Sequence, residues 1–93
     1  MPVEAVAGPA RVRLLTRPGC HLCEQARSVV AQVCAETGET YEEVDIDAAA
    51  QTDPGLRRRY TDEVPVTFVD GVQHDFFRVD PDRLRRALAR TRA

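Results

Sequence analysis

Residues 14–23 read Leu-Leu-Thr-Arg-Pro-Gly-Cys-His-Leu-Cys, a stretch that predicts a strand, a tight turn and the start of a helix. The segment 11–16 alternates polar and apolar residues before two leucines, which is typical of a strand that enters a core. A proline and a glycine then interrupt it. Over 20–37, apolar residues recur every three or four positions, which predicts a helix, and Gly38 is expected to end it. Two cysteines therefore stand where the strand turns into the helix.

The rest of the chain continues this alternation of strands and helices. We expect a strand at 41–46, a helix at 53–60, strands at 66–69 and 72–77, and a last helix that Asp80-Pro81 opens. Asp-Pro pairs start both later helices, because aspartate caps a helix and proline suits its first turn. Asp70-Gly71 predicts a two-residue hairpin. The order is β-α-β-α-β-β-α, in which the first β-α-β unit favours parallel pairing and the hairpin adds an antiparallel pair.

Composition places the chain among small globular proteins. Its 93 residues have room for one domain, and a content of 43% hydrophobic and 30% charged residues excludes a disordered chain. No apolar run reaches the roughly eighteen residues of a membrane span, and the net charge of −2 argues against a nucleic-acid-binding protein. Residues 1–10 lack the features of a secretory signal, so we expect a flexible leader, a domain over 11–92 and a cytoplasmic location.

The motif Cys20-His21-Leu22-Cys23 carries the predicted chemistry. Residues three apart in the first turn of a helix are neighbours, at about 5–6 Å between Cβ atoms, so the two thiols can close a disulfide. A C-x-x-C motif near a βαβ unit in a cytosolic protein is also a thioredoxin-like redox signal.

The two thiols are expected to differ. Cys20 would lie at the N-cap, where free N–H groups and the helix dipole stabilise a thiolate, so its pKa can fall from ~8.5 to between ~3.5 and ~7.5. Arg17 and a protonated His21 would add to this effect, whereas Glu24 would oppose it. Cys23 would be shielded and keep a higher pKa. We therefore expect Cys20 to attack a substrate disulfide and Cys23 to resolve the mixed disulfide.

A second motif, Val64-Pro65, stands directly before a predicted interior strand. Proline is normally unwelcome there, because it cannot donate to the sheet. A cis Val64–Pro65 bond would resolve the conflict by bending the chain at the start of the strand. The backbone edge at this bend could then hydrogen-bond an extended thiol substrate beside the two cysteines.

These motifs together resemble a glutaredoxin, and more narrowly the short bacterial glutaredoxin-like proteins of the thioredoxin fold. The resemblance covers roughly residues 11–89 and rests on three stretches, 14–23, Val64-Pro65 and 68–71. It implies an α/β thioredoxin-like fold, in which a four-stranded mixed sheet is flanked by three helices.

The resemblance also implies roles for individual residues. Cys20 would be the nucleophile, Cys23 the resolving thiol and Pro65 a cis proline. Arg17 occupies the position of a basic residue that contacts the glutathione carboxylate, and the backbone of Val64 would pair with the glutathione cysteine.

Two departures from the glutaredoxin pattern bear on the electron donor. His21-Leu22 replaces the usual Pro-Tyr between the cysteines, and residues 76–80 read Phe-Phe-Arg-Val-Asp where the family normally has Gly-Gly and an acidic residue. That glycine pair grips the γ-glutamyl end of glutathione. The donor therefore stays open among glutathione, another small thiol and a protein reductase.

Simpler interpretations compete for the remaining cysteine and histidines. The Cys20/Cys23 pair could be half of a zinc site, although Cys34, His21 and His74 lack the spacing of a second ligand pair. We expect Cys34 to pack in the core, as free cysteines usually do. We expect His74 to be an ordinary strand residue.

We therefore expect a monomeric thiol–disulfide oxidoreductase, without a bound cofactor, that reduces protein or mixed disulfides through Cys20 and Cys23. Its partners would be disulfide-containing proteins or small thiols, with no nucleic acid and no membrane. The alternative is a non-catalytic thioredoxin-fold binding module that holds a partner protein or a metal at the Val64-Pro65 edge.

Overall fold

The computed structural model describes residues 10–91, which form four strands and four helices. In chain order the elements are β1 (Val12–Thr16), α2 (His21–Thr37), β2 (Tyr41–Asp45), α3 (Ile46–Ala49), α4 (Pro54–Tyr60), β3 (Val66–Val69), β4 (Val72–Phe76) and α5 (Pro81–Thr91). The predicted order is confirmed, with the short helix α3 in addition. Apart from Ala10, the predicted leader lies outside the described residues.

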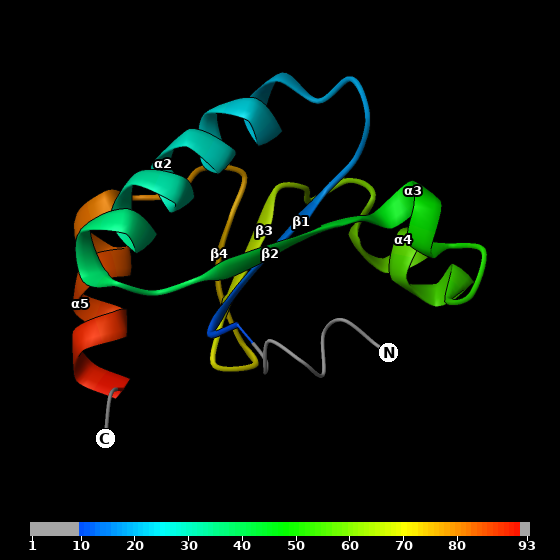
Figure 1. Ribbon diagram of the computed structural model, residues 1–93. Coiled ribbons are helices and arrows are strands. Elements are labelled where there is room, and N and C mark those ends of the chain that lie inside the picture. The colour runs from blue at the N-terminus through cyan, green and yellow to red at the C-terminus, as the bar shows by residue number, and fades with distance from the viewer. Residues whose placement is uncertain (1–9, 92–93) are drawn as a thin grey trace.

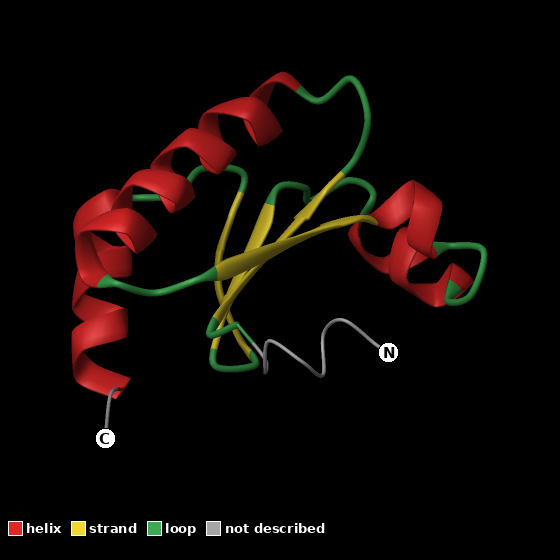
Figure 2. Cartoon of the chain, viewed as in Figure 1, coloured by secondary structure: helices red, strands yellow, loops and turns green. Residues whose placement is uncertain are grey.

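The strands form one mixed sheet in the order β2-β1-β3-β4. β1 and β2 pair in parallel and β3 and β4 pair antiparallel, as the sequence predicts. β1 and β3 also pair antiparallel. Helices α2 and α5 lie together on one side of the sheet, and α3 and α4 lie at its opposite end and face (Figure 1). The three layers, helices around a central sheet, are clear in Figure 2.

Each face of the sheet has its own apolar core. The larger core lies under α2 and α5, and its fully buried residues include Val12, Leu14, Val30, Val33 and Leu84. The smaller core, on the side of α3 and α4, consists of Leu15, Cys23, Ile46, Tyr60, Val64 and Val66. The second cysteine of the predicted motif is therefore part of the smaller core.

The predicted capping and turn residues lie where expected. Gly38 ends α2 with φ 78°, a left-handed conformation that glycine adopts without a steric clash. The carboxylate of Asp53 accepts the N–H of Leu56 at 3.3 Å, and that of Asp80 accepts the N–H of Asp82 at 2.9 Å. Each bond satisfies an N–H that would otherwise lack a partner in the first helical turn.

Two predicted strand ends are wrong by one residue. Ile46 is the first residue of α3, because Asp45 caps this helix and its Oδ1 accepts the N–H of Asp47 at 2.9 Å. The second strand therefore ends at Asp45, and the prediction of three helices is corrected to four within residues 10–91. The strand predicted over 72–77 ends at Phe76, since Phe77 has φ 66°, outside the range of extended backbone.

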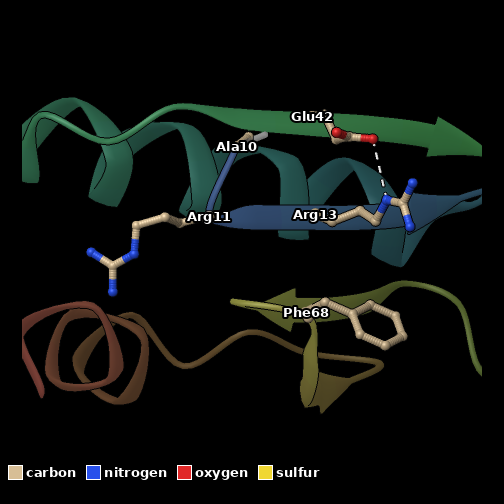
Figure 3. A pocket seen from close by; sticks show the side chains of 6 residues that line it. Ala10, Arg11, Arg13, Glu42 and Phe68 are labelled. Carbon is tan, nitrogen blue, oxygen red and sulfur yellow. Dashed lines mark hydrogen bonds and ion pairs between the residues drawn. The ribbon is translucent and has the colours of Figure 1, made fainter. Parts of the chain in front are cut away.

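A hollow of about 380 Å³ opens beside the first residues of β1. In Figure 3, Arg13 on β1 reaches Glu42 on β2, and Phe68 lies on the neighbouring β3. Arg13 Nε and Glu42 Oε2 are 3.2 Å apart. Neither Cys20 nor Cys23 lines it, and both come after the other end of β1, so this hollow is separate from the cysteine pair. Among residues 10–91, no helix has the length and apolar character to cross a membrane.

Candidate functional site

Cys20 and Cys23 form a disulfide across the first turn of α2, with their Cα atoms 5.2 Å apart. Cys20 is the N-cap of the helix, in an extended conformation with φ −100° and ψ 109°. Its Sγ accepts the N–H of Cys23 at 3.1 Å. The sulfur of Cys20 therefore takes the place of the oxygen in an ordinary helix cap and faces the positive end of the helix dipole.

The two cysteines differ in exposure. Cys20 is half-buried and packs against the edge of the smaller core, whereas Cys23 is 1% exposed and lies inside it. A disulfide outside the protein can reach Cys20 but not Cys23. This difference in depth is the one that the sequence predicts.

The Val64–Pro65 peptide bond is cis, as expected, and both residues are buried. Val64 shares the smaller core with Cys23, so the fold brings these two distant motifs together. The N–H of Val64 donates to the Tyr60 carbonyl at 3.1 Å, while its own carbonyl has no partner among the described residues. The N–H of Val64 is therefore already bonded within the protein. Its carbonyl oxygen is the group that could accept a hydrogen bond from a substrate at the expected backbone edge.

Arg17 and His21 are both exposed, next to Cys20 in the chain. Arg17 has no ion-pair partner within the part of the chain that the structure describes. His21 Nδ1 lies 3.9 Å from Glu24 Oε1, an exposed pair on the first turn of α2. Neither side chain hydrogen-bonds to the cysteines among residues 10–91, so their expected contacts with a substrate or a thiolate stay predictions.

A polar network, missed by the sequence analysis, anchors the strand end before Cys20. The buried Thr16 hydroxyl donates to Glu43 Oε2 at 2.9 Å, and Arg27 donates to both oxygens of Glu43 at 2.7 and 2.6 Å. The hydrogen bonds from Arg27 hold the pKa of Glu43 below its usual value. The network ties β1 to β2 and α2 directly before the loop that carries Cys20. It depends on the register of the parallel pair, for which the sequence offers no signal.

A second missed feature is a cleft of about 190 Å³ between α2 and the segment after β4. Leu22 and Val29 line it from α2, and Phe77 and Arg78 line it from the other side. In the sequence, residues 76–80 differ from the glutaredoxin pattern but do not by themselves indicate a cleft. An unusual pair of adjacent phenylalanines was the available signal.

The remaining thiol and imidazole lie away from the cysteine pair. Cys34 is 3% exposed in the larger core, as expected, and burial raises the pKa of its thiol. His74 lies in β4, as expected, and burial lowers the pKa of its imidazole. Residues 10–91 contain no cluster of three or more histidine, cysteine or acidic side chains that could hold a metal ion.

Known proteins are similar to this chain in sequence and in fold. Residues 11–89 match the model of the glutaredoxin-like domain (DUF836). The uncharacterized protein Rv0508 of Mycobacterium tuberculosis is 40% identical over 82 residues, which cover 87% of this chain and 84% of that protein. The X-ray structure of protein XcR50 from X. campestris is 31% identical, with a TM-score of 0.67 over 86% of this chain and 97% of that one.

A more distant structure identifies the fold alone. The thioredoxin Deadhead of Drosophila melanogaster is 18% identical, with a TM-score of 0.56 over 96% of this chain and 87% of that chain. The protein therefore has a thioredoxin-like fold and belongs to the glutaredoxin-like domain family.

Proposed function

We propose that the protein is a thiol–disulfide oxidoreductase that reduces protein or mixed disulfides through Cys20. The observation that carries this proposal is the placement of the two sulfurs. The accessible Cys20 sulfur caps α2 and accepts the N–H of Cys23, and the buried Cys23 sulfur lies within bonding distance of it. An accessible thiol at a helix N-terminus is the microenvironment in which cysteines become reactive.

The reaction has two steps. The Cys20 thiolate attacks one sulfur of the substrate disulfide, the substrate S–S bond breaks, and the other substrate sulfur leaves and takes a proton from water. Cys23 then loses its proton and attacks Cys20 Sγ, which breaks the mixed disulfide and releases the second substrate thiol. Two electrons pass from the two cysteines to the substrate, and the Cys20–Cys23 disulfide is the oxidised product.

The cycle closes when an external reductant restores the two thiols. A low-molecular-weight thiol, glutathione or another, or a protein reductase would supply the electrons, and no bound cofactor is needed because the cysteines carry them. The proposal places a monomeric protein in the cytoplasm, where small thiols keep such pairs reduced. Its partners are disulfide-containing proteins or small thiols, not nucleic acid or membranes.

Serine variants test the two roles separately. The reduced protein is mixed with a peptide disulfide in a single turnover, so no electron donor has to be known, and the thiols released are counted by mass spectrometry. Cys20→Ser should abolish the reaction, and Cys23→Ser should stop at a trapped mixed disulfide on Cys20. Cys34→Ser is the matched control and should react at the original rate, because Cys34 lies in the other core. Full activity in Cys20→Ser would overturn the proposal and favour a non-catalytic binding module.

A further inference from the structure

An exposed aromatic pair lies at the end of β4. Phe76 is 50% exposed and Phe77 is 42% exposed, and their ring centroids are 4.9 Å apart. Besides them, Val72 is the one other large apolar residue in the described chain with comparable exposure. Exposed apolar groups that cluster on a small protein mark surfaces for interaction. We call Phe76 and Phe77 the aromatic rim.

The aromatic rim adjoins the cysteine motif on two sides. The N–H of Phe77 donates to the Pro65 carbonyl at 2.8 Å, which ties the rim to the bend beside Cys23. Across the cleft of about 190 Å³, Phe77 faces Leu22, one of the two residues between the cysteines. When a substrate segment brings a disulfide to Cys20, the residues next to its cysteine can therefore contact the rings of Phe76 and Phe77.

The backbone of Phe77 has an unfavourable conformation for a residue with a side chain. Arg78 donates its N–H to the Phe76 carbonyl at 2.8 Å, so residues 76–78 form a three-residue turn with Phe77 at its centre. With φ 66°, Phe77 has the rare and strained form of this turn, a conformation that glycine adopts far more easily. Strained residues of this kind cluster at binding and active sites.

Two acidic and two basic side chains, Asp75, Asp80, Arg78 and Arg83, line the hollow at the rim. Arg78 is exposed and has no ion-pair partner among residues 10–91, as is also true of Arg17. The two acidic residues nearest in the chain are already engaged: Asp75 pairs with Arg83 at 3.1 Å, and Asp80 caps α5. Arg78 is therefore the cation beside the rings that is left without an ion-pair partner among residues 10–91, and it complements an acidic side chain.

We propose that the substrate of this site is a disulfide of a partner protein, held in an extended segment with an apolar residue next to the reactive cysteine and an acidic residue near it. This inference rests on the oxidoreductase function proposed above. The apolar side chain would cover the aromatic rim, the acidic one would pair with Arg78, and a main-chain N–H would donate to the open Val64 carbonyl. A small disulfide offers neither side chain and would leave the rings exposed.

The test uses peptides whose single cysteine is joined in a mixed disulfide to 2-nitro-5-thiobenzoate. Reduced protein in excess releases this coloured thiol in one turnover, so the rate needs no external reductant. A peptide with leucine and aspartate near the cysteine is compared with two others, in which serine replaces the leucine or asparagine replaces the aspartate. Bis(2-hydroxyethyl) disulfide serves as the small probe.

We expect the leucine peptide to react about tenfold faster than the serine peptide, a ratio typical of burying one apolar side chain. Phe76→Ser and Phe77→Gly should each bring that ratio close to one. Val72→Ser is the matched control, since Val72 is an exposed apolar residue at the far end of the same strand, and it should keep the ratio. The aspartate peptide should also exceed the asparagine peptide, with a difference that salt removes.

The outcomes separate this inference from the function on which it rests. Equal rates for the leucine and serine peptides in the unaltered protein, with the small disulfide still reduced, would overturn the substrate class and leave the oxidoreductase function intact. A preference for the leucine peptide that persists in Phe76→Ser and Phe77→Gly would place the docking surface elsewhere. That result would also overturn the proposal that the aromatic rim selects the substrate. Failure to reduce any probe would overturn both proposals. Equal rates for the aspartate and asparagine peptides would overturn the acidic requirement.

Discussion

Replacing Phe77 with glycine and, separately, with alanine should reverse the usual order of stability of these two residues. In most of a folded chain alanine is the more stable choice, because glycine loses more conformational freedom on folding. Phe77 is held at φ 66°, where a Cβ atom is strained and glycine is not. Phe77→Gly should therefore be more stable than Phe77→Ala, although both variants lose the same ring.

The size of the difference follows from two opposing terms. A residue with a side chain in a sparsely populated backbone region costs about 1–3 kcal/mol, and glycine avoids that cost. Glycine in turn destabilises the folded state by about 0.5–1 kcal/mol relative to alanine, because it has more conformational freedom to lose on folding. The net free-energy difference is about 1 kcal/mol in favour of Phe77→Gly, which for a domain of this size corresponds to roughly 4–8 °C in Tm.

Phe76 provides the matched control for this comparison. It is the same residue type, is similarly exposed, and directly precedes Phe77, but it pairs with Val66 as part of β4. There, Phe76→Gly should be less stable than Phe76→Ala by about 0.5–1 kcal/mol. Thermal unfolding followed by circular dichroism measures all four variants under one condition. The expected result is a change of sign between two neighbouring positions.

An alanine variant at position 77 as stable as the glycine variant would refute the reasoning. It would mean that the turn at residues 76–78 relaxes to an ordinary conformation once the ring is removed. The ring would then not be held against the preference of the backbone. The substrate test would remain decisive for the docking surface itself.

Three further expectations concern the cysteine pair and its supports. In the reduced protein, the rate of iodoacetamide alkylation at Cys20 should rise at a pH well below the ~8.5 of an ordinary cysteine, while the buried Cys23 and Cys34 should react slowly; equal titration of all three, read by mass spectrometry, would contradict the capping argument. Arg27 lowers the pKa of Glu43 in the folded state, so this pair stabilises the fold above the ordinary glutamate pKa of ~4.3 and loses that effect as pH falls below it. Glu43→Gln should therefore lower the urea midpoint at neutral pH and converge with the parent protein in acid; parallel curves would show that the ion pair contributes nothing. Asp53→Ala should lower the free energy of unfolding by about 1 kcal/mol, because α4 loses its cap. Asp53→Asn should keep most of that stability, because asparagine caps a helix about as well as aspartate.

Features set by neighbouring residues could be predicted from the sequence. The helix caps at Cys20, Asp53 and Asp80, the stop at Gly38 and the hairpin at Asp70-Gly71 all lie where expected. Each depends on one or two residues whose chemistry favours a single backbone conformation. The order of the elements along the chain, the parallel β1–β2 pair and the antiparallel hairpin were likewise predicted, because a βαβ unit and a tight turn each favour one sense of pairing.

Features that need the sheet register could not be predicted in this way. The parallel pair sets Glu43 opposite Leu14, and Glu43 lies on the face of the sheet toward α2. Thr16, two residues after Leu14, lies on the same face, so its hydroxyl can reach Glu43. Nothing local in the sequence specifies that pairing. The bond from the Val64 N–H to the Tyr60 carbonyl is likewise a result of how the chain leaves α4. It uses the N–H of Val64 and leaves the Val64 carbonyl as an acceptor with no partner among the described residues.

The cysteine motif and the surface beside it therefore differ in how they can be recognised. Pro65 contradicts a local preference that can be read from the sequence, because proline is unfavourable directly before an interior strand. Phe77 contradicts a local preference that only the structure shows. Phenylalanine favours strands, and its positive φ is seen only in the folded chain. A 2.8 Å hydrogen bond joins these two positions, and both border the turn that carries Cys20. Positions where local preference loses to the fold are where function is expected. The reactive sulfur can thus be found from sequence, whereas the surface that would select its substrate requires the structure.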